Sequence, residues 1–509
     1  KYQLQYTQLE KQLLKGYFFR PSWDISKSFG KQHRWVAGAG YFSDQNQIKS
    51  KLTDSLVAES FSFHEYKYYV QSNWGESSRW GLNYFSRQNY FPVGKSFQAL
   101  DVSRNYVFQI DWQDNPNLQW RMNTTYRILY DQRLQTKEKS LTNRTETNWN
   151  VWDHLVEGQL LYETSGGQEQ QREYSYVAVP AGQGMYYWID YNNNGIEELN
   201  EFELAVFQDQ KKYIRVNTPV SRYVKCLNNN INLAFQINPN APTVNNTRNI
   251  LDFIRRFSTA TFFQLNTKSY SNNKLLMNPL SFNLNDTSLI SMQTLFSNTI
   301  YFNKNNRIWM ADITRDQSNQ KSLMLYGYEQ NNTNRYKGSV RINWNNSLST
   351  SITANHSNLE LSTENAAFLN RNYAIRISAV EPSANYLFQR NFRVGLSWKF
   401  QQGENKKSGN ESCQSDVGTV DVRYQVQKGG SVQIRFSQHR LRYASSNTQI
   451  TPAGFILLEG LQPGQNKTWS VLISQRFAGN LECNLQYEGR SAGTGRLIHT
   501  GTASVRALF

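Results

Sequence analysis

The chain has 509 residues and a net charge of +16, and 14% of its residues are aromatic, including 30 Tyr and 13 Trp. Its mean hydropathy is negative, and no apolar run approaches the roughly 18 residues that a membrane helix needs, which excludes a helical membrane protein. The basic residues are dispersed instead of gathered in a stripe or tail, which argues against nucleic-acid binding.

Many aromatic residues at low mean hydropathy are typical of a transmembrane β-barrel, in which only alternate residues of each strand face lipid. An early example of the pattern is LQWRMNTTYRILY, residues 118–130. Trp120 and Met122 fall on one face of this segment, whereas Arg121 and Arg127 fall on the other. The alternation predicts a strand with an apolar face and a polar face.

The middle of the chain, between 163 and 250, has weaker alternation and many turn residues, and we expect a turn-rich insertion there. It contains DYNNNGIEELNE (190–201), which has the spacing of a 12-residue EF-hand calcium loop. The expected calcium ligands at positions 1, 3, 5, 7 and 12 are Asp190, Asn192, Asn194, Ile196 through its backbone carbonyl, and Glu201. Asn at positions 3 and 5 predicts weak binding, with a Kd of roughly 10⁻⁴ to 10⁻³ M. The other interpretation is an Asn-Gly turn without an ion.

The C-terminal half repeats the strand pattern, as in NFRVGLSWKF (391–400) and TVDVRYQV (419–426). Seven basic residues are expected on the polar face, which would line the lumen of a barrel: Arg121, Arg127, Arg393, Lys399, Arg423, Arg435 and Arg506. One interpretation is a ladder of charges that satisfies polar groups between strands. The other is a cationic interior that favours anionic solutes or lipid phosphates, and the excess of Arg over acidic residues supports it.

Short and long connections alternate along the last third of the chain, as periplasmic turns and extracellular loops do in a barrel. Tight turns are expected at EPSAN (381–385), QKGG (427–430) and AGN (478–480), and long polar connections at 401–417 and 444–467. The segment from Tyr386 to Phe400 keeps its alternation long enough for one tilted membrane strand, which takes about 9 to 11 residues.

The C-terminus ends in GTASVRALF, in which the apolar residues Ala503, Val505, Ala507 and Phe509 share one face. A last strand with alternating apolar residues and a final aromatic resembles the signal that outer-membrane barrels present to their insertion machinery. We therefore expect these four residues to serve as a C-terminal insertion signal.

Two stretches, 179–216 and 485–509, resemble large outer-membrane proteins of Bacteroidota, a group of unassigned general function. The first contains the calcium-loop pattern, and the second is the C-terminal ending. The resemblance implies an outer-membrane location and a C-terminal barrel in a longer secreted chain. Further N-terminal material before Lys1 is therefore expected.

Catalytic and metal-binding patterns are sparse. The six histidines and three cysteines have no zinc-site spacing. Ser437 and His439 share the polar face of one predicted strand, and Asp421 lies on a neighbouring one. Because the register between these strands is not fixed by the sequence, we favour a polar lining over a hydrolase, and we expect no enzyme activity.

The predicted fold is all-β: a large single-chain antiparallel transmembrane β-barrel of roughly 18–24 strands over residues 1–509, with long extracellular loops. We expect a protein of the Gram-negative outer membrane that acts as a structural, secretion- or transport-associated subunit of a cell-envelope complex. A free-standing channel or receptor for solutes, including anionic ones, is the first alternative, and an outer-membrane hydrolase is the second. Expected partners are outer-membrane lipid and lipopolysaccharide, the barrel insertion machinery and other envelope proteins, and the expected cofactor is Ca²⁺.

Overall fold

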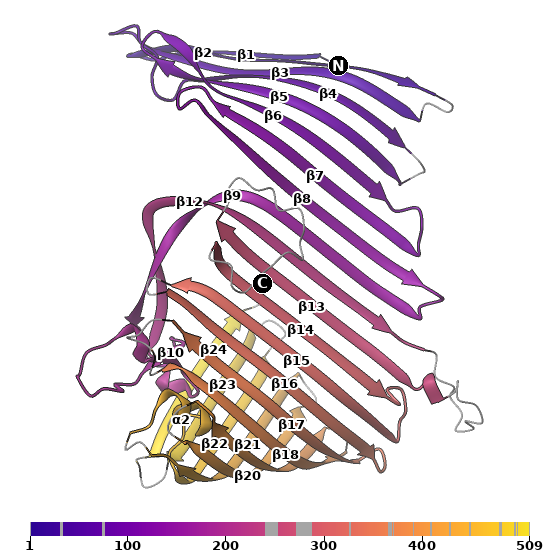
Figure 1. Cartoon of the computed structure of the whole chain (residues 1–509), viewed down its shortest axis with the longest axis vertical. Helices are drawn as coiled ribbons and strands as arrows, with labels where there is room; N and C mark the ends of the chain where they lie inside the picture. Colours follow the sequence, from indigo (N-terminus) through magenta and orange to yellow (C-terminus); the bar gives the residue numbers. More distant parts are fainter. Residues whose placement is uncertain are drawn as a thin grey trace. The chain divides into compact units, whose positions relative to one another are not determined.

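The computed structural model is almost entirely β-structure. It describes residues 2–30, 34–73, 77–239, 253–270, 288–324, 327–364, 369, 371–389, 391–407, 410–426, 429–446, 449–477, 481–492, 495 and 497–507. Within these residues there are 24 strands, and Figure 1 shows their order. None of the described helices is both long enough and apolar enough to cross a membrane.

The chain divides into two compact units, one made of 1–169, 224–235 and 264–290 and the other of the remaining residues. In the first unit each strand pairs antiparallel with the next in the chain. Its strands are β1 (Tyr2–Glu10), β2 (Leu14–Phe29), β3 (Trp35–Ser50), β4 (Phe61–Asn73), β5 (Arg79–Val93), β6 (Ser96–Trp112), β7 (Leu118–Asp131), β8 (Thr136–Val151) and most of β9 (Val156–Ala178).

The second unit follows the same rule from β14 to β24, again with antiparallel pairing of chain neighbours. These strands are β14 (Leu289–Phe302), β15 (Trp309–Met324), β16 (Gly327–Asn343), β17 (Leu348–Thr363), β18 (Tyr373–Phe388), β19 (Phe392–Asn405), β20 (Ser412–Val426), β21 (Gly430–Ala444), β22 (Gly464–Phe477), β23 (Leu481–Ala492) and β24 (Leu497–Ala507). The helix α2 (Pro452–Leu457) lies between β21 and β22. Two further strands, β12 (Tyr213–Ile237) and β13 (Phe257–Tyr270), have residues in both units.

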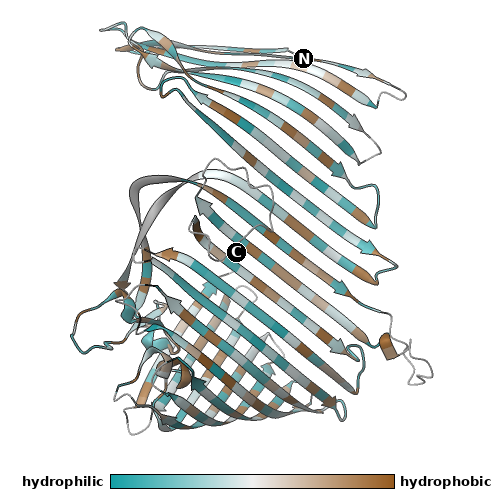
Figure 2. Cartoon of the chain, in the orientation of Figure 1, coloured by the Kyte–Doolittle hydropathy of each residue, from teal (hydrophilic) through white to brown (hydrophobic). Residues whose placement is uncertain are grey.

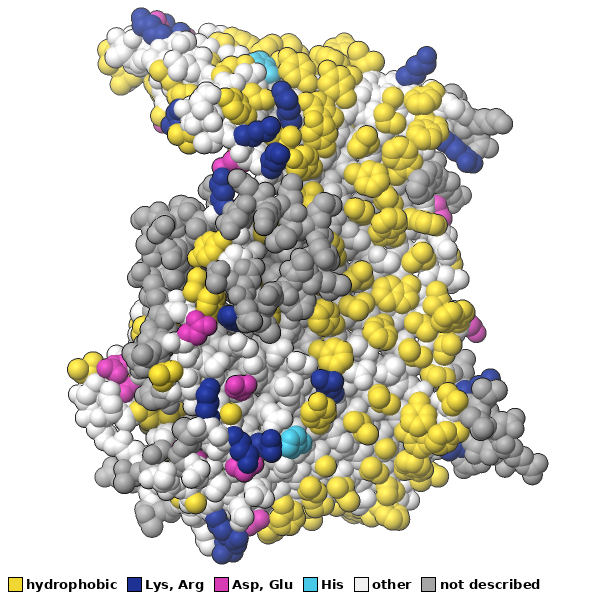
Figure 3. All heavy atoms as spheres, viewed as in Figure 1, with side chains coloured by type: hydrophobic (Ala, Val, Ile, Leu, Met, Phe, Trp, Pro, Cys, Tyr) yellow, Lys and Arg dark blue, Asp and Glu magenta, His cyan; other side chains and the backbone are white. Residues whose placement is uncertain are grey.

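One face of these strands is apolar and open to the surroundings. Leu396 lies opposite Val420, and Val420 lies opposite Phe436, with exposed fractions of 53%, 39% and 40%. Figure 2 shows the alternation of hydrophobic and hydrophilic residues along the strands, and Figure 3 shows the hydrophobic side chains spread over the strands at the right of the view. A soluble protein rarely exposes so broad an apolar surface, so this face is the one that contacts lipid. The predicted class, an all-β antiparallel transmembrane β-barrel, is confirmed.

The predicted turn at EPSAN (381–385) is wrong, because β18 runs straight through it. Pro382 pairs with Ile352 on the β17 side, while toward β19 the register passes from Val380 to Ser383 without a partner for the residues between them. A proline has no N–H to donate to a neighbouring strand, and the interruption of pairing toward β19 accommodates this missing donor. The strand therefore tolerates the proline that suggested a turn.

Two further predictions in this region are wrong. The segment Tyr386–Phe400 is not one strand, since β18 ends at Phe388 and β19 begins at Phe392, with Gln389 at a φ of +48° in the turn between them. The long connection expected at 401–417 shrinks to 406–411, because β19 and β20 continue through polar residues. Strand pairing outside the lipid needs no apolar face, so hydropathy does not mark where such strands end.

The connections that follow β20 and β21 agree with the sequence. The predicted turn at 427–430 lies between β20 and β21, although 427–428 are outside the described residues, as is the predicted turn at 478–480. The long connection expected at 444–467 spans 445–463 and carries α2. The predicted insertion (163–250) contains much of β9 and all of β12, and its residues 240–250 lie outside the described residues. Between β9 and β12 the irregular part of the insertion is the 179–212 segment.

Candidate functional site

The polar face of β19–β21 carries an excess of positive charge. Arg393 lies directly opposite Arg423, and Arg435 lies opposite Asp421. The carboxylate of Asp421 accepts from Nε of Arg423 at 2.9 Å and from Nε of Arg435 at 3.2 Å. Arg393 instead donates to the amide oxygen of Asn385 at 2.8 Å. Two guanidinium groups thus share one carboxylate and the third contacts a neutral amide. We call Arg393, Arg423 and Arg435 the basic cluster.

Charges on β5–β9, in the first unit, are arranged differently. Arg121 contacts Asp111 at 3.2 Å and Glu146 at 3.5 Å. Arg144 continues the row by pairing with Glu146 and with Glu163. Together with Arg79, which pairs with Asp111, this row contains three basic and three acidic residues. The contacts on β5–β9 are those that the charge-ladder interpretation predicts, whereas β19–β21 carry an excess of positive charge.

The other predicted polar-face residues lie apart from the basic cluster. Arg127 is opposite Asn105 and Ser140. The ammonium group of Lys399 is 2.8 Å from a carboxylate oxygen of Glu459, which follows α2. Arg506 is opposite Glu482.

The C-terminal strand has the predicted parity. Val505 and Ala503 lie opposite Cys483 and Leu485 on the apolar face. Ala507 lies opposite Leu481 on the same face, and Val505 is 71% exposed. Phe509 is outside the described residues, so the role of these residues as an insertion signal stays a prediction.

The 179–212 segment packs onto the strands of the second unit. It contains β10 (Tyr186–Trp188) and β11 (Phe202–Leu204), which pair as a short hairpin, and two 3-10 turns at Leu199–Glu201 and Gln208–Gln210. Asp209 approaches Arg490 of β23 to 2.6 Å, and the ring of Phe207 lies 4.2 Å from Cζ of the same arginine. Only 10% of the Arg490 side chain is exposed, so the segment covers it.

The 445–463 connection packs on the same strands and meets the 179–212 segment. Its residues Ala453, Leu457, Leu458 and Leu461 form a buried core with side chains of β17, β18, β20 and β21, and Phe207 packs against that core. Gly460 has a φ of +73°, and a Cβ there would come within 3.1 Å of Val206. Glycine therefore permits the close contact between the two connections.

A buried carboxylate lies where the 179–212 segment meets the ends of β16 and β18. Glu203 of β11 is 4.0 Å from the guanidinium of Arg371, which is 3.5 Å from Glu329. Only 14% of the Glu203 side chain and 14% of the Arg371 side chain are exposed. Burial raises the pKa of Glu203 to about 7; Arg371 opposes this shift, and Glu329 adds to it. Two carboxylates thus share one guanidinium, and Glu203 is mostly protonated below about pH 7.

The loop 190–201 has the backbone of a tight polar turn. Asn193 and Gly195 have φ values of +58° and +70°. The Asp190 carboxylate accepts from the N–H of Asn194 at 3.2 Å and of Gly195 at 2.9 Å. Glu201, 1% exposed, accepts from Nε1 of Trp188 at 2.9 Å and from the N–H of Tyr191 at 3.2 Å. The predicted ligands at positions 1 and 12, Asp190 and Glu201, therefore stabilise the loop through hydrogen bonds to its own backbone.

Oxygen atoms suited to calcium line this loop. The amide oxygens of Asn192 and Asn194 accept backbone N–H groups of the loop, and their amide nitrogens both donate to Glu198. Among the described residues no group of three His, Cys, Asp or Glu side chains is arranged to hold a metal, so amide and backbone oxygens would have to complete the set. Oxygen ligands of this kind fit a weakly held calcium ion. Ile196, whose carbonyl is the predicted position-7 ligand, is 62% exposed.

We predict a small calcium-dependent gain in stability at this loop. Calcium at ten times its Kd should stabilise the folded chain by about 1.4 kcal/mol. Asp190→Asn keeps an acceptor for the loop N–H groups but removes a negative charge, so it should abolish the gain. Glu201→Ala is the less informative variant, because Glu201 also accepts a hydrogen bond from Trp188. Losing that bond would destabilise the loop even in chelator. Melting curves in calcium and in chelator test this, and identical wild-type curves would contradict it.

The candidate hydrolase residues do not form a triad. Ser437 exchanges a hydrogen bond with Thr419 at 2.9 Å, and Nε2 of His439 contacts the hydroxyl of Thr468 at 3.1 Å. Asp421 is engaged by Arg423 and Arg435 instead. The predicted polar-lining role describes the contacts of these residues.

Several residues of the site carry no recognisable signal in the sequence. Glu203 and Asp209 lie in the turn-rich segment, and their partners Arg371 and Arg490 lie far along the chain, the latter 281 positions away. Glu198, at position 9 of the calcium-like loop, could have been found from the EF-hand pattern, which places a ligand there.

No known protein family and no curated protein matches this sequence. Among solved structures, the ferric-catecholate import receptor Fiu of E. coli K12 in its open form is 11% identical and has a TM-score of 0.33. The match covers 94% of this chain and 75% of the Fiu chain. The iron transporter FrpB of Neisseria meningitidis is 7% identical with a TM-score of 0.37, covering 97% and 80%. OmpT, an outer membrane protein of Vibrio cholerae, is 8% identical with a TM-score of 0.29, covering 81% and 96%. Likenesses this weak do not define an activity, and the resemblance to Bacteroidota proteins stays a prediction.

Proposed function

We propose that this protein is an integral outer-membrane channel that conducts small anionic solutes across the envelope of a Gram-negative bacterium. The observation that carries the proposal is the basic cluster, in which Arg423 and Arg435 share the carboxylate of Asp421 and Arg393 contacts only the neutral amide of Asn385. The side chains of Arg423 and Arg435 are each 51% exposed, so they are open to a passing solute.

The sign and place of these charges support an anion path. Charged side chains along a narrow, low-dielectric path raise the local concentration of ions of the opposite sign. The charge row on β5–β9 is balanced, so it adds little net field, whereas the basic cluster has a net charge of about +2. We infer that β19–β21 provide the selective part of the path.

The packed connections support a restriction on solute size. The 179–212 and 445–463 segments lie at the same ends of β18–β23 and share a buried core, so they occupy space on the polar face. A path narrowed by such connections suits small solutes better than large ones.

Ion selectivity in planar bilayers tests the proposal. We expect wild type to prefer chloride over potassium, and Arg393→Gln and Arg423→Gln each to lower the chloride preference by roughly threefold. The matched control is Arg315→Gln, which removes the same charge from the opposite face, where Arg315 lies over the ring of Tyr336. It should leave selectivity unchanged.

Two results would contradict the proposal. One is a wild-type chain that conducts without preference for anions. The other is a chain that does not conduct and instead leaves the membrane in mild detergent with stoichiometric partner proteins, which would favour a structural subunit of an envelope complex.

A further inference from the structure

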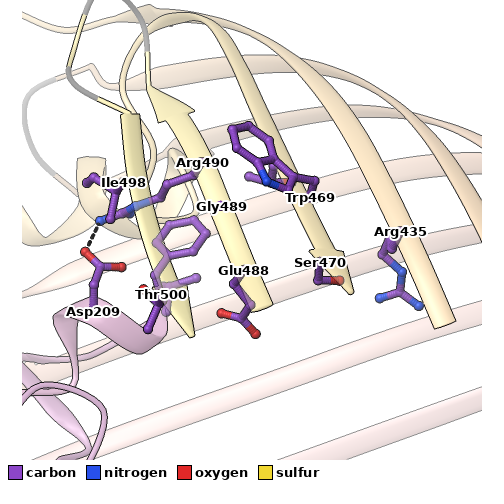
Figure 4. A pocket seen from close by; sticks show the side chains of 12 residues that line it. Asp209, Arg435, Trp469, Ser470, Glu488, Gly489, Arg490, Ile498 and Thr500 are labelled. Carbon is purple, nitrogen blue, oxygen red and sulfur yellow. Dashed lines mark hydrogen bonds and ion pairs between the residues drawn. The ribbon is translucent and has the colours of Figure 1, made fainter. Parts of the chain in front are cut away.

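A cavity lies between the 179–212 segment and strands β21–β24 (Figure 4). Its volume is about 210 Å³. Val206, Phe207 and Asp209 form one wall, and strand residues form the rest. Pockets for drug-sized ligands usually measure roughly 300 to 1,000 Å³, so this one suits a molecule smaller than a drug-sized ligand.

The two ends of the cavity carry opposite charges. Arg435 lies opposite Ser470, and Ser470 lies opposite Glu488, so all three share the polar face across β21, β22 and β23. Figure 4 shows them in a row across these strands. Two strand spacings separate the backbones of the two charged residues by roughly 10 Å.

The other two charged groups of the cavity neutralise each other. Arg490 and Asp209 form an ion pair at 2.6 Å, and the ring of Phe207 covers Arg490. Arg435 and Arg423 share the single carboxylate of Asp421, so this group of three side chains keeps a net positive charge that can attract an anionic group of a ligand. Glu488 accepts from the neutral side chain of Gln486 at 2.6 Å, so no cation offsets its negative charge in that contact.

We propose that this cavity binds a small zwitterion, namely an α-amino acid with an apolar side chain. Its carboxylate pairs with Arg435 and its ammonium group with Glu488; the hydroxyl group of Ser470 lies between these two residues, and that of Thr500 lies beyond Glu488 on β24. The apolar side chain packs against Val206 and Ile498. A charge pair at fixed spacing discriminates against ligands that have only one of the two charges, because such ligands lose one of the two charge-assisted contacts.

The inference rests on the proposed channel function, since Arg435 belongs to both the basic cluster and the cavity. It adds a class of ligand to the path: an apolar α-amino acid has no net charge, so Arg435 would recognise its carboxylate and not an overall negative charge. Binding can nevertheless be measured without conduction, so the two proposals fail separately.

Isothermal titration calorimetry on the detergent-solubilised full chain tests the site with three probes. These are L-leucine, 4-methylpentanoate, which lacks the ammonium group, and 3-methylbutylamine, which lacks the carboxylate. We expect wild type to bind L-leucine at least tenfold more tightly than either analogue. Glu488→Gln should weaken L-leucine at least tenfold and leave 4-methylpentanoate within twofold, whereas Arg435→Gln should weaken both.

The matched control is Glu482→Gln, which makes the same change on β23 at a residue outside the cavity. It should bind L-leucine as wild type does, and the heat-dependent shift in gel mobility verifies folding of each variant. Equal binding of L-leucine and 4-methylpentanoate, no effect of Glu488→Gln, or no binding of any probe would each overturn the zwitterion site. An anion-selective chain that ignores L-leucine would refute only this site, and a chain that binds L-leucine without anion selectivity would refute only the channel.

Discussion

Asp209→Ala is expected to release the 179–212 segment from β23 and to destabilise its docked position by on the order of 3–5 kcal/mol. The reason is that Arg490 is only 10% exposed and would keep its charge without its partner at 2.6 Å. Phe207 would still cover one side of the guanidinium, which limits how far water can reach it. Hydrogen exchange of 203–212 measures the effect as faster exchange under native conditions.

Two comparisons separate this ion pair from a general loss of charge. Replacing both partners, as Asp209→Ala with Arg490→Leu, should restore much of the protection, because an apolar pair leaves no buried charge. Glu10→Ala removes the exposed partner of Lys51 in the first unit and should cost at most about 1 kcal/mol. Unchanged exchange in Asp209→Ala would mean that the hydrophobic contacts of Phe207 alone hold the segment.

Raising the pH from 5 to 8 is expected to loosen the same segment through Glu203. Its pKa is about 7 in the docked state against a reference value of 4.5, so the docked state binds more protons across this interval. The stabilising proton is fully present below about pH 4.5 and is lost as the pH rises through about 7. At about 1.36 kcal/mol per pH unit, the full loss is on the order of 3 kcal/mol.

The groups around Glu203 set the size of this effect. Arg371 favours the charged form, whereas burial and the second carboxylate, Glu329, favour the neutral one, and Tyr191 lies beside the same carboxyl group. Glu203→Gln should remove the pH dependence of exchange in 186–204 and hold the segment docked at pH 8. Glu197→Gln, at an exposed carboxylate of the same segment, should keep the wild-type dependence. Equal pH profiles for wild type and Glu203→Gln would contradict the role of this group.

The sequence by itself determined the fold class and the faces of the strands. Period-two alternation is local, and the need to hide alternate side chains in lipid is strong, so the parity of Arg393, Arg423 and Val505 could be read without any tertiary information. The tight backbone of the 190–201 loop also followed from a local signal, because Asn-Gly tolerates positive φ at little cost.

Only the tertiary structure decided where strands end and which distant residues meet. Pro382 lies inside β18, where it pairs with β17 and has no partner on β19. No local sequence pattern encodes this pairing, so the sequence alone suggested a turn. The contacts of Glu203 with Arg371 and of Asp209 with Arg490 join residues far apart in the chain, so their burial and the pKa of Glu203 follow from how the 179–212 segment packs. The cavity with Arg435 and Glu488 exists for the same reason: strand pairing sets the spacing of the two charges, and the docked segment supplies one wall.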